Sequence, residues 1–266
     1  MTICLIDADV LKYSCGYSIE KREVGDEYNT IIVEPVEHAF YNINSIIKKV
    51  LDRCKSKKYK CFLTKMGDRS NYRYSIDPDY KVNRAKAGKP IYYESCHNFI
   101  LSSHQAFETE GQEADDAVSI EHCTLHPFGF DPAIKNSIIC SIDKDFNNVP
   151  GWHYNWRRDE LYFVTELDAL KNFYLQILTG DTCDDIPRIK KRWRKKQAEA
   201  SLQKATTEQE MFEIVFLEVL KTMQDEGHST YAVNKKITER GQLVWLRRTP
   251  NEMWQIPSTN SITSKI

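Results

Sequence analysis

The stretch Ile3-Cys-Leu-Ile-Asp-Ala-Asp9, close to the start of the chain, predicts a short buried strand followed by carboxylates. Four consecutive apolar residues are typical of a strand that is covered on both faces of a sheet. Asp7 and Asp9 come directly after the apolar run, and residues two apart in an extended chain point to the same side. We therefore expect both side chains to lie together at the carboxyl end of this strand.

The same arrangement recurs farther along the chain. Ser137-Ile-Ile-Cys-Ser-Ile142 is an apolar run followed by Asp143-Lys-Asp145, and Lys60-Cys-Phe-Leu-Thr64 predicts another strand. Apolar residues at helical spacing predict helices over residues 36–55, 115–125 and 165–178. Strands that alternate with helices of this length indicate an α/β fold with a mostly parallel sheet flanked by helices.

The character of the sequence changes after Gly180. Residues 180–248 are expected to be helical, first basic and then amphipathic, whereas residues 1–179 form the α/β core. Residues 66–90 lack apolar periodicity, and we interpret them as a functional surface segment. The last stretch, residues 249–266, is polar and contains prolines, so a loosely held tail is expected.

Composition limits the class of protein. The 266 residues are 41% hydrophobic and 28% charged, which is typical of a soluble globular chain. We see neither an apolar run of membrane-spanning length nor a basic leader followed by an apolar stretch, and therefore expect a cytoplasmic protein. Eight cysteines are scattered without a Cys-x-x-Cys pair, which favours reduced thiols over a disulfide framework or a cysteine zinc site.

Two further acidic groups join those that follow the strands. Glu113, Asp115 and Asp116 precede a predicted helix, and Asp181 and Asp184 follow Gly180. In open α/β sheets the ligand crevice lies at the carboxyl ends of the strands. Neighbouring carboxylates repel each other unless a cation neutralises them, and an all-oxygen ligand set suits Mg²⁺ or Mn²⁺. Two such ions can activate water and stabilise the leaving oxygen of a phosphodiester.

Each acidic pair also has an ordinary structural interpretation. Asp and Glu at a helix start are usually caps, and Asp after a strand is usually a turn residue. Four such pairs in one chain favour a metal site over four separate caps.

Positive charge is concentrated in two segments, although the formal net charge is only −1. The first covers residues 81–89, where Lys81, Arg84, Lys86 and Lys89 follow Arg73 and are interleaved with tyrosines that include Tyr80. Bases stacked on rings and phosphates held by cations would suit a single-stranded end. The second segment predicts binding to duplex DNA, with a solvated helix face as the alternative; its basic residues are Arg188, Lys190, Lys191, Arg192, Arg194, Lys195 and Lys196.

The acidic motifs resemble those of a known superfamily. Glu113-Ala-Asp-Asp116, Ser141-Ile-Asp-Lys-Asp145-Phe and Gly180-Asp-Thr-Cys-Asp184-Asp-Ile-Pro187 are similar, in order and spacing, to motifs of the 5′–3′ exonuclease and flap endonuclease superfamily. Gly67-Asp68, Arg73 and Asp77-Pro-Asp-Tyr-Lys81-Val-Asn-Arg84 look most similar to exonucleases of short-tailed phages. The resemblance extends over roughly residues 3–190, and the combination is more specific than any single motif.

The resemblance implies a PIN-like α/β core with an arch or clamp at about residues 72–107, two Mg²⁺ or Mn²⁺ ions, and products with a 5′-phosphate. It places Asp7, Asp68, Glu113, Asp115 and Asp116 in a first metal site, and Asp143, Asp145, Asp181 and Asp184 in a second. Asp9 matches only some members. Lys81 and Arg84 match basic residues that contact the scissile phosphate, and Arg73 is assigned to the same catalytic set.

The chain departs from the superfamily after Asp184-Asp-Ile-Pro187. Members usually carry a glycine-rich hairpin of a helix–three-turn–helix motif there, whose backbone holds duplex phosphates and often a potassium ion. Residues 188–196 contain no glycine, which argues against both the potassium ion and the backbone grip. Side-chain charge would have to replace them in a divergent helical DNA-binding region.

These observations predict a monomeric, metal-dependent 5′ to 3′ DNA exonuclease or flap endonuclease of phage replication or recombination. One alternative is a PIN-type ribonuclease, including an RNase H-like activity on RNA–DNA hybrids. Another is a DNA-binding protein with an inactive site, although an inactive relative should have lost several of the acids.

Overall fold

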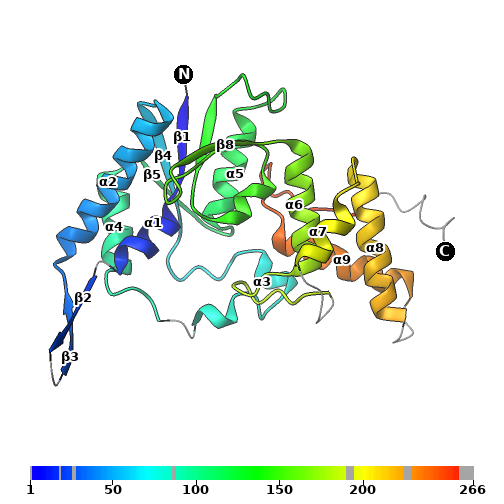
Figure 1. The fold of residues 1–266 in the computed structure, drawn as a ribbon, viewed down its shortest axis with the longest axis horizontal. Coiled ribbons are helices and arrows are strands. Elements are labelled where there is room, and N and C mark those ends of the chain that lie inside the picture. The colour runs from blue at the N-terminus through cyan, green and yellow to red at the C-terminus, as the bar shows by residue number, and fades with distance from the viewer. Residues whose placement is uncertain are drawn as a thin grey trace. The chain divides into compact units, whose positions relative to one another are not determined.

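The structure, a computed structural model, describes residues 2–17, 19–25, 28–85, 88–189, 195–224 and 229–257 (Figure 1). The chain forms two compact units from interleaved segments. The first unit comprises Met1–Asp68, Gly88–Lys144 and Trp152–Phe163, and the second comprises Arg69–Ala87, Asp145–Gly151 and Val164–Ile266. This division differs from the boundary expected near residue 180, because the helix before Gly180 buries its apolar face among the C-terminal helices.

A six-stranded sheet forms the centre of the first unit. The strand order is β5 (Ala106–Thr109), β4 (Lys58–Thr64), β1 (Ile3–Asp7), β6 (Ser137–Cys140), β7 (Gly151–Asn155) and β8 (Glu160–Val164). β1 runs parallel to both β4 and β6, and β4–β5 and β6–β7 are also parallel pairs. The parallel pairing brings the carboxyl ends of β1, β4 and β6 to one edge of the sheet, as the sequence predicts.

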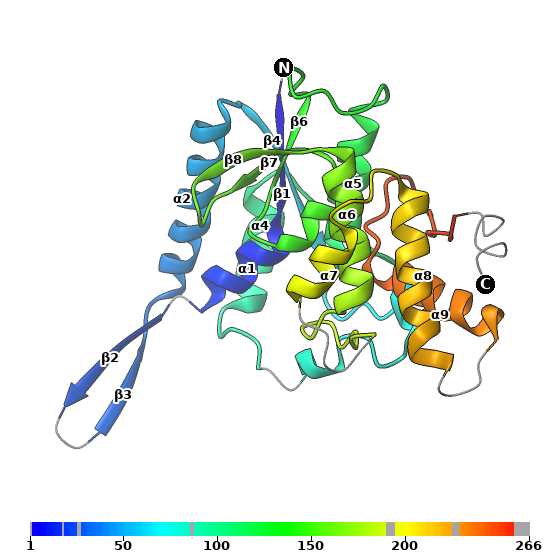
Figure 2. The same ribbon diagram turned by 45° about the vertical axis from the view of Figure 1, so that its right-hand side comes forward.

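Helices cover both faces of this sheet. α1 (Ala8–Gly16), α2 (Val36–Cys54) and α4 (Tyr93–Ser103) pack with Cys4 and Ile6 in one core. α5 (Ala114–Thr124) lies on the opposite face against β1, β4 and β6 (Figure 2). Leu5, between Cys4 and Ile6, is fully buried as well. The apolar run of β1 is therefore covered on both sides, which confirms the α/β prediction.

Several elements of the first unit were not predicted from the sequence. β2 (Ile19–Gly25) and β3 (Tyr28–Val33) form an antiparallel pair between α1 and α2. Strands β5, β7 and β8 were also missed. In β5 and β7 polar residues interrupt the apolar ones, whereas β8 contains a short apolar run, Leu161-Tyr-Phe-Val164, that the prediction overlooked.

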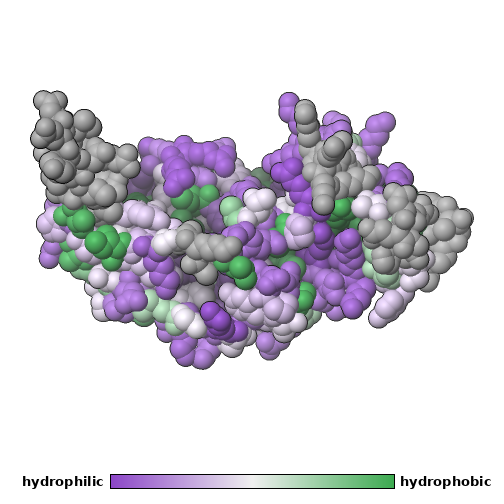
Figure 3. Space-filling view, turned by 90° about the horizontal axis from the view of Figure 1, so that it is seen from below, coloured by the Kyte–Doolittle hydropathy of each residue, from purple (hydrophilic) through white to green (hydrophobic). Residues whose placement is uncertain are grey.

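The second unit is built from helices around its own core. Most of its buried side chains come from α6 (Glu166–Thr179), α7 (Lys195–Leu202), α8 (Glu208–Gln224) and α9 (Thr230–Val244). Helices were expected after residue 180, whereas α6 was expected to belong to the α/β core. α3 (Arg73–Ile76) and the 3-10 turns η1 (Val82–Ala85) and η2 (Lys144–Asn148) are short. Among the residues that the structure describes, none belongs to a helix long and apolar enough to span a bilayer. Hydrophilic residues dominate the face shown in Figure 3, where apolar side chains form only small patches.

The expectation of a loose tail from residue 249 is wrong for its first part. Trp254 is only 5% exposed, and its ring lies 5.1 Å from the ring of Phe173 and 6.2 Å from that of Tyr174. A Cβ atom added to Gly241 would lie 2.1 Å from a ring carbon of Trp254. The chain after α9 therefore folds back and completes the helical core. Residues 258–266 lie outside the described residues.

The contact between Gly241 and Trp254 gives a stability prediction. Helix propensity alone makes Gly→Ala in a helix stabilising by about 1 kcal/mol. We expect the opposite for Gly241→Ala, a loss of about 1–3 kcal/mol, because the new methyl group would overlap the indole ring. Thermal unfolding would show a melting temperature lowered by several degrees, whereas Gly88→Ala, which meets nothing within 4 Å, should change it little. A Gly241→Ala protein as stable as the wild type would contradict this packing.

Candidate metal and phosphate sites

Asp7 is the residue at which β1 ends and α1 begins. Its Oδ1 accepts a hydrogen bond from the Val10 amide at 3.5 Å and caps the helix, and its Oδ2 accepts one from the Ser141 hydroxyl at 2.9 Å. The side chain is only 4% exposed. The chain thus turns into a helix at once, so the predicted extended tip with Asp7 and Asp9 on one side is wrong: Asp9 lies in the first turn of α1.

Asp9 is held by donors of the protein itself. Its carboxylate accepts hydrogen bonds from the Thr64 amide at 3.1 Å and the Thr64 hydroxyl at 2.5 Å. The Lys12 ammonium, which is almost fully buried, lies 2.6 Å from Asp9 Oδ1. Asp9 therefore joins α1 to the end of β4, a positioning role that agrees with its lower rank among the expected ligands.

Thr64 continues this chain of hydrogen bonds to the acids of α5. Its hydroxyl accepts a bond from the Ala114 amide at 2.9 Å, at the first turn of the helix. Glu113 is the N-cap of α5 and forms a capping box with Asp116, whose side chain is fully buried. The amide of Asp116 also donates to Asp115 Oδ1 at 2.7 Å. The three acids thus gather at one helix start, partly as caps, as the structural alternative predicts.

Asp68 and Asp143 belong to the same unit. Asp68 Oδ2 accepts a hydrogen bond from the Gly111 amide at 2.8 Å, in the loop that leads to α5. The amide of Asp143 donates to the Ser141 hydroxyl at 3.0 Å, and that hydroxyl donates to Asp7. Ser141 therefore connects the ends of β1 and β6. Sequence reasoning did not single out Ser141, Thr64 or Lys12, although each lies within three residues of a predicted acid or ends a predicted strand.

The electrostatic effect of this arrangement is concentrated on Asp7. Burial, together with the nearby carboxylates of Asp9 and Asp143, raises the pKa of the Asp7 carboxyl to about 7, against the lowering effect of the Ser141 and Val10 hydrogen bonds. Negative charge at the end of β1 is thus only partly compensated by the protein, a situation that a cation would relieve. Among the described residues of this unit, no three carboxylates bring their oxygens within 4.8 Å of one another. Carboxylate oxygens are the ligands that suit Mg²⁺, which keeps several of its waters.

Asp184 is the centre of a charged group in the second unit. Its carboxylate is paired with the Arg84 guanidinium and lies 3.6 Å from the Lys81 ammonium. The Tyr80 hydroxyl donates to it at 3.2 Å, and the Lys81 amide donates to the Asp184 carbonyl oxygen at 3.2 Å. Lys81 has a positive φ of 59°, so its backbone is fixed in an uncommon conformation. Basic residues predicted to contact a phosphate therefore surround one of the predicted metal ligands.

A tight loop presents Asp181 and Asp184. The backbones of Asp181 and Ile186 exchange two hydrogen bonds of 2.9 and 2.8 Å, and Asp181 Oδ1 accepts another from the Cys183 amide at 2.8 Å. Gly180 has a φ of +63°, and a Cβ there would lie 2.3 Å from the Ile186 carbonyl oxygen. Only glycine fits that close approach.

The four residues predicted for the second metal site do not all belong to the same unit. Asp143 belongs to the first unit, whereas Asp145, Asp181 and Asp184 belong to the second. β6 ends at Cys140 and Asp145 lies in η2, so the strand does not continue to these acids as expected.

Two residues of the predicted functional set have structural roles instead. The Arg73 guanidinium is 1% exposed and donates to the carbonyl oxygens of Leu243 at 2.9 Å and Trp245 at 2.8 Å. Tyr80 is 3% exposed and packs edge-on against Tyr74. Both placements contradict direct contact with a nucleic acid, because these side chains are buried in the core of the second unit. Residues 66–90 were expected to form a surface segment.

The remaining predicted basic residues fall into two groups. Lys89, Arg188, Lys195 and Lys196 are exposed, and the Lys89 ammonium lies over the Tyr93 ring. The others lie outside the described residues: Lys86, Lys190, Lys191, Arg192 and Arg194.

Comparisons with known proteins bear on the fold. No family model matches the chain. The exonuclease of Escherichia phage T7 is 26% identical over 112 residues, which cover 41% of this chain and 36% of that relative, so the match spans about a third of the relative's length.

Solved structures extend the likeness over most of the chain. A bacteriophage T5 D15 flap endonuclease in a pseudo-enzyme–product complex with DNA and metal ions matches with a TM-score of 0.57 and 13% identity, covering 92% of this chain and 99% of that one. The T5 5′-exonuclease with bound zinc matches with a TM-score of 0.57 and 14% identity, covering 92% and 100%. The chain therefore has the fold of these phage 5′ nucleases and resembles the 5′–3′ exonuclease and flap endonuclease superfamily.

The raised pKa of Asp7 predicts a pH-dependent cost in metal-free protein. A carboxyl with a folded pKa of about 7 and an unfolded value of 3.8 destabilises the fold increasingly as pH rises from about 4 to 7. In EDTA at pH 8 we expect Asp7→Asn to have a free energy of unfolding roughly 1–3 kcal/mol larger than that of the wild type, and therefore a higher melting temperature. Near pH 4 this difference should disappear. The exposed Asp52→Asn should show no such trend. An Asp7→Asn effect that is the same at every pH would contradict the assigned environment.

Proposed function

We propose that the protein is a divalent-metal-dependent nuclease that hydrolyses DNA from 5′ ends or flaps and releases 5′-phosphate products. The observation that carries the proposal is the buried Asp7 carboxyl at the carboxyl end of β1. The negative charges of Asp9 and Asp143 repel its charge, and the contacts described above include no cation paired with it. The fold shared with phage 5′ nucleases supports it. A role in phage DNA replication or recombination, and a monomeric state, are part of the same proposal.

The acids of the first unit are the proposed ligands of one Mg²⁺ or Mn²⁺ ion: Asp7, Asp68, Glu113, Asp115 and Asp116. We assign Asp143, Asp145, Asp181 and Asp184 to a second ion on the sequence resemblance. Divalent ions held there would supply Lewis-acid activation of water and of the phosphate. The protein's own part is to fix the carboxylates, through the Asp9–Thr64–Ala114 chain and through Ser141. A potassium ion is not part of the proposal.

Lys81 and Arg84 are the proposed phosphate-binding residues. Asp184 holds both cations on one side of a tight loop, so their charge is already positioned before substrate arrives. Preorganised charge of this kind stabilises the extra negative charge of a phosphoryl-transfer transition state.

The exposed Arg188, Lys195 and Lys196 are proposed to bind duplex phosphates on the helical unit, together with the other basic residues of segment 188–196. Lys89, beside Tyr93, is proposed to guide the 5′-terminated strand.

A direct test measures cleavage of end-labelled duplex DNA, 5′-flap DNA and an RNA–DNA hybrid in Mg²⁺. We expect cleavage of the DNA substrates by the wild type, lowered at least about 100-fold in Asp143→Asn and Asp68→Asn, because each replaces a ligand carboxylate by a neutral amide of nearly the same shape. DNA affinity in Ca²⁺ should remain within a few-fold. The exposed Asp131→Asn serves as the matched control.

Each alternative has its own outcome in this experiment. Degradation of RNA strands alone would favour a ribonuclease and reject the DNA specificity. A protein that binds DNA but shows no metal-dependent cleavage would be a binding module, and the nuclease proposal would be wrong.

Lys81→Ala and Arg84→Ala test the phosphate assignment. We expect each to lower kcat by about 10- to 1,000-fold while the Mg²⁺ concentration needed for half-maximal activity changes little, since the cations act on the substrate. Lys235→Ala, an exposed lysine of the same unit, should keep full activity. Equal activity in all three variants would contradict the assignment.

A further inference from the structure

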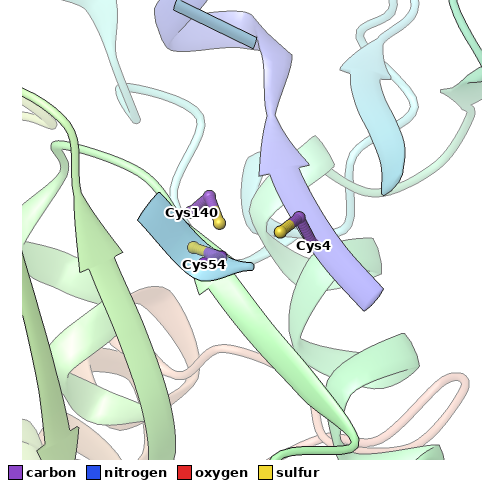
Figure 4. Close-up of side chains that lie close together, drawn as sticks. All are labelled: Cys4, Cys54 and Cys140. Carbon is purple, nitrogen blue, oxygen red and sulfur yellow. The ribbon is translucent and has the colours of Figure 1, made fainter. Parts of the chain in front are cut away.

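Three cysteines from distant parts of the sequence meet in the core of the first unit (Figure 4). Cys4 lies on β1, Cys54 is the last residue of α2, and Cys140 is the last residue of β6. Their Sγ atoms all lie within 4.8 Å of one another. Cys4 and Cys140 have no exposed surface, and Cys54 is 7% exposed. We call these three residues the thiol cluster.

The thiol cluster differs from the other buried cysteines of the protein. Cys15, Cys61 and Cys96 are also buried, and a lone buried cysteine behaves as a small apolar residue. Among the described residues, only Cys4, Cys54 and Cys140 form a group with the spacing of metal ligands. Thiolates about 2.3 Å from one ion lie roughly 4 Å apart, so small rotamer changes would suffice for all three to bind it.

The close approach of the three sulfurs affects how readily Cys4 loses its proton. The neighbouring Cys140 and Cys54 side chains lower the pKa of Cys4, whereas burial raises the pKa of Cys140, whose thiol donates to the Ile138 carbonyl oxygen at 3.5 Å. The thiolate is the form that binds metals. An incoming soft cation would displace the protons of the thiols that bind it.

The ligand set selects the class of ion. Structural zinc sites almost always have four ligands, and the group contains three cysteines with no histidine or carboxylate among the described residues. The nearby Ser56 hydroxyl is already engaged, since it donates to the carbonyl oxygens of Thr2 and Lys58 at 2.8 Å each. Soft sulfur ligands disfavour Mg²⁺ and Mn²⁺ and favour Cu(I). A three-coordinate soft ion fits best.

We propose that Cys4, Cys54 and Cys140 form a three-coordinate thiolate site for a soft, thiophilic ion of the Cu(I) class. Binding replaces thiol protons by the ion and requires no change of oxidation state. The ion would join β1, β6 and the end of α2. Because the native fold alone assembles the three ligands, binding would stabilise it. Cys54, at the end of its helix, is the member of the thiol cluster with some exposed surface, so we expect the ion to enter beside it.

The test is an anaerobic titration with Cu(I) in competition with a coloured Cu(I) chelator, on protein carrying Cys183→Ser to remove the exposed thiol. We expect one tightly held equivalent, a rise in melting temperature, and a weakening of at least about 100-fold in Cys54→Ala and in Cys140→Ala. Cys61→Ala and Cys96→Ala, matched buried cysteines outside the thiol cluster, should bind as the parent does.

X-ray absorption spectroscopy of the Cu(I)-loaded parent protein identifies the atoms bound to copper. This measurement needs no cysteine variant of the core, so it does not depend on whether such a variant folds. Three sulfur neighbours around copper are expected. Two sulfurs, or nitrogen and oxygen neighbours, would overturn the proposal, as would equal Cu(I) affinity in Cys54→Ala. Neither readout depends on nuclease activity.

Discussion

The rest of the first unit depends on one carboxyl group, that of Asp7, at the end of the largely buried strand β1. β1 can be covered on both faces because it is apolar, and the same burial removes water from Asp7. Ser141 and the Val10 amide supply two hydrogen bonds, but Asp9 and Asp143 add negative charge, and the pKa of Asp7 rises to about 7. A charge that costs free energy in the empty protein is well placed to bind a cation, because binding then removes the cost.

The two units treat their acids differently. In the first, Asp9 is neutralised by Lys12 and tied to Thr64, so it supports the other carboxylates and need not bind a metal. In the second, Asp184 is paired with Lys81 and Arg84, about a hundred residues earlier in the sequence. An acid next to two cations can hold those cations in place for a phosphate. Alternatively, it can become free to bind a metal ion when the phosphate takes its place beside the cations. We propose the first role as the one present before substrate arrives.

The sequence predicted the elements whose signal is local. β1, β6 and α2 were found because a continuous apolar run or helical spacing reflects direct burial. The acids were found because they follow those strands. Arg73 and Tyr80 were misassigned because charge and aromatic character at a motif resemble a binding surface, whereas only the fold shows that both are buried. Pairings such as Asp9 with Thr64, or Cys4 with Cys54, depend on long-range contacts that no spacing rule contains.

Crystals of the protein soaked in Mn²⁺ would test the metal assignment most directly, through anomalous scattering at the manganese edge. We predict a peak within about 2.0–2.3 Å of carboxylate oxygens from the set Asp7, Asp68, Glu113, Asp115, Asp116 and Asp143. A structure at saturating Mn²⁺ with no peak beside these residues, or with peaks only at other surface acids, would contradict it.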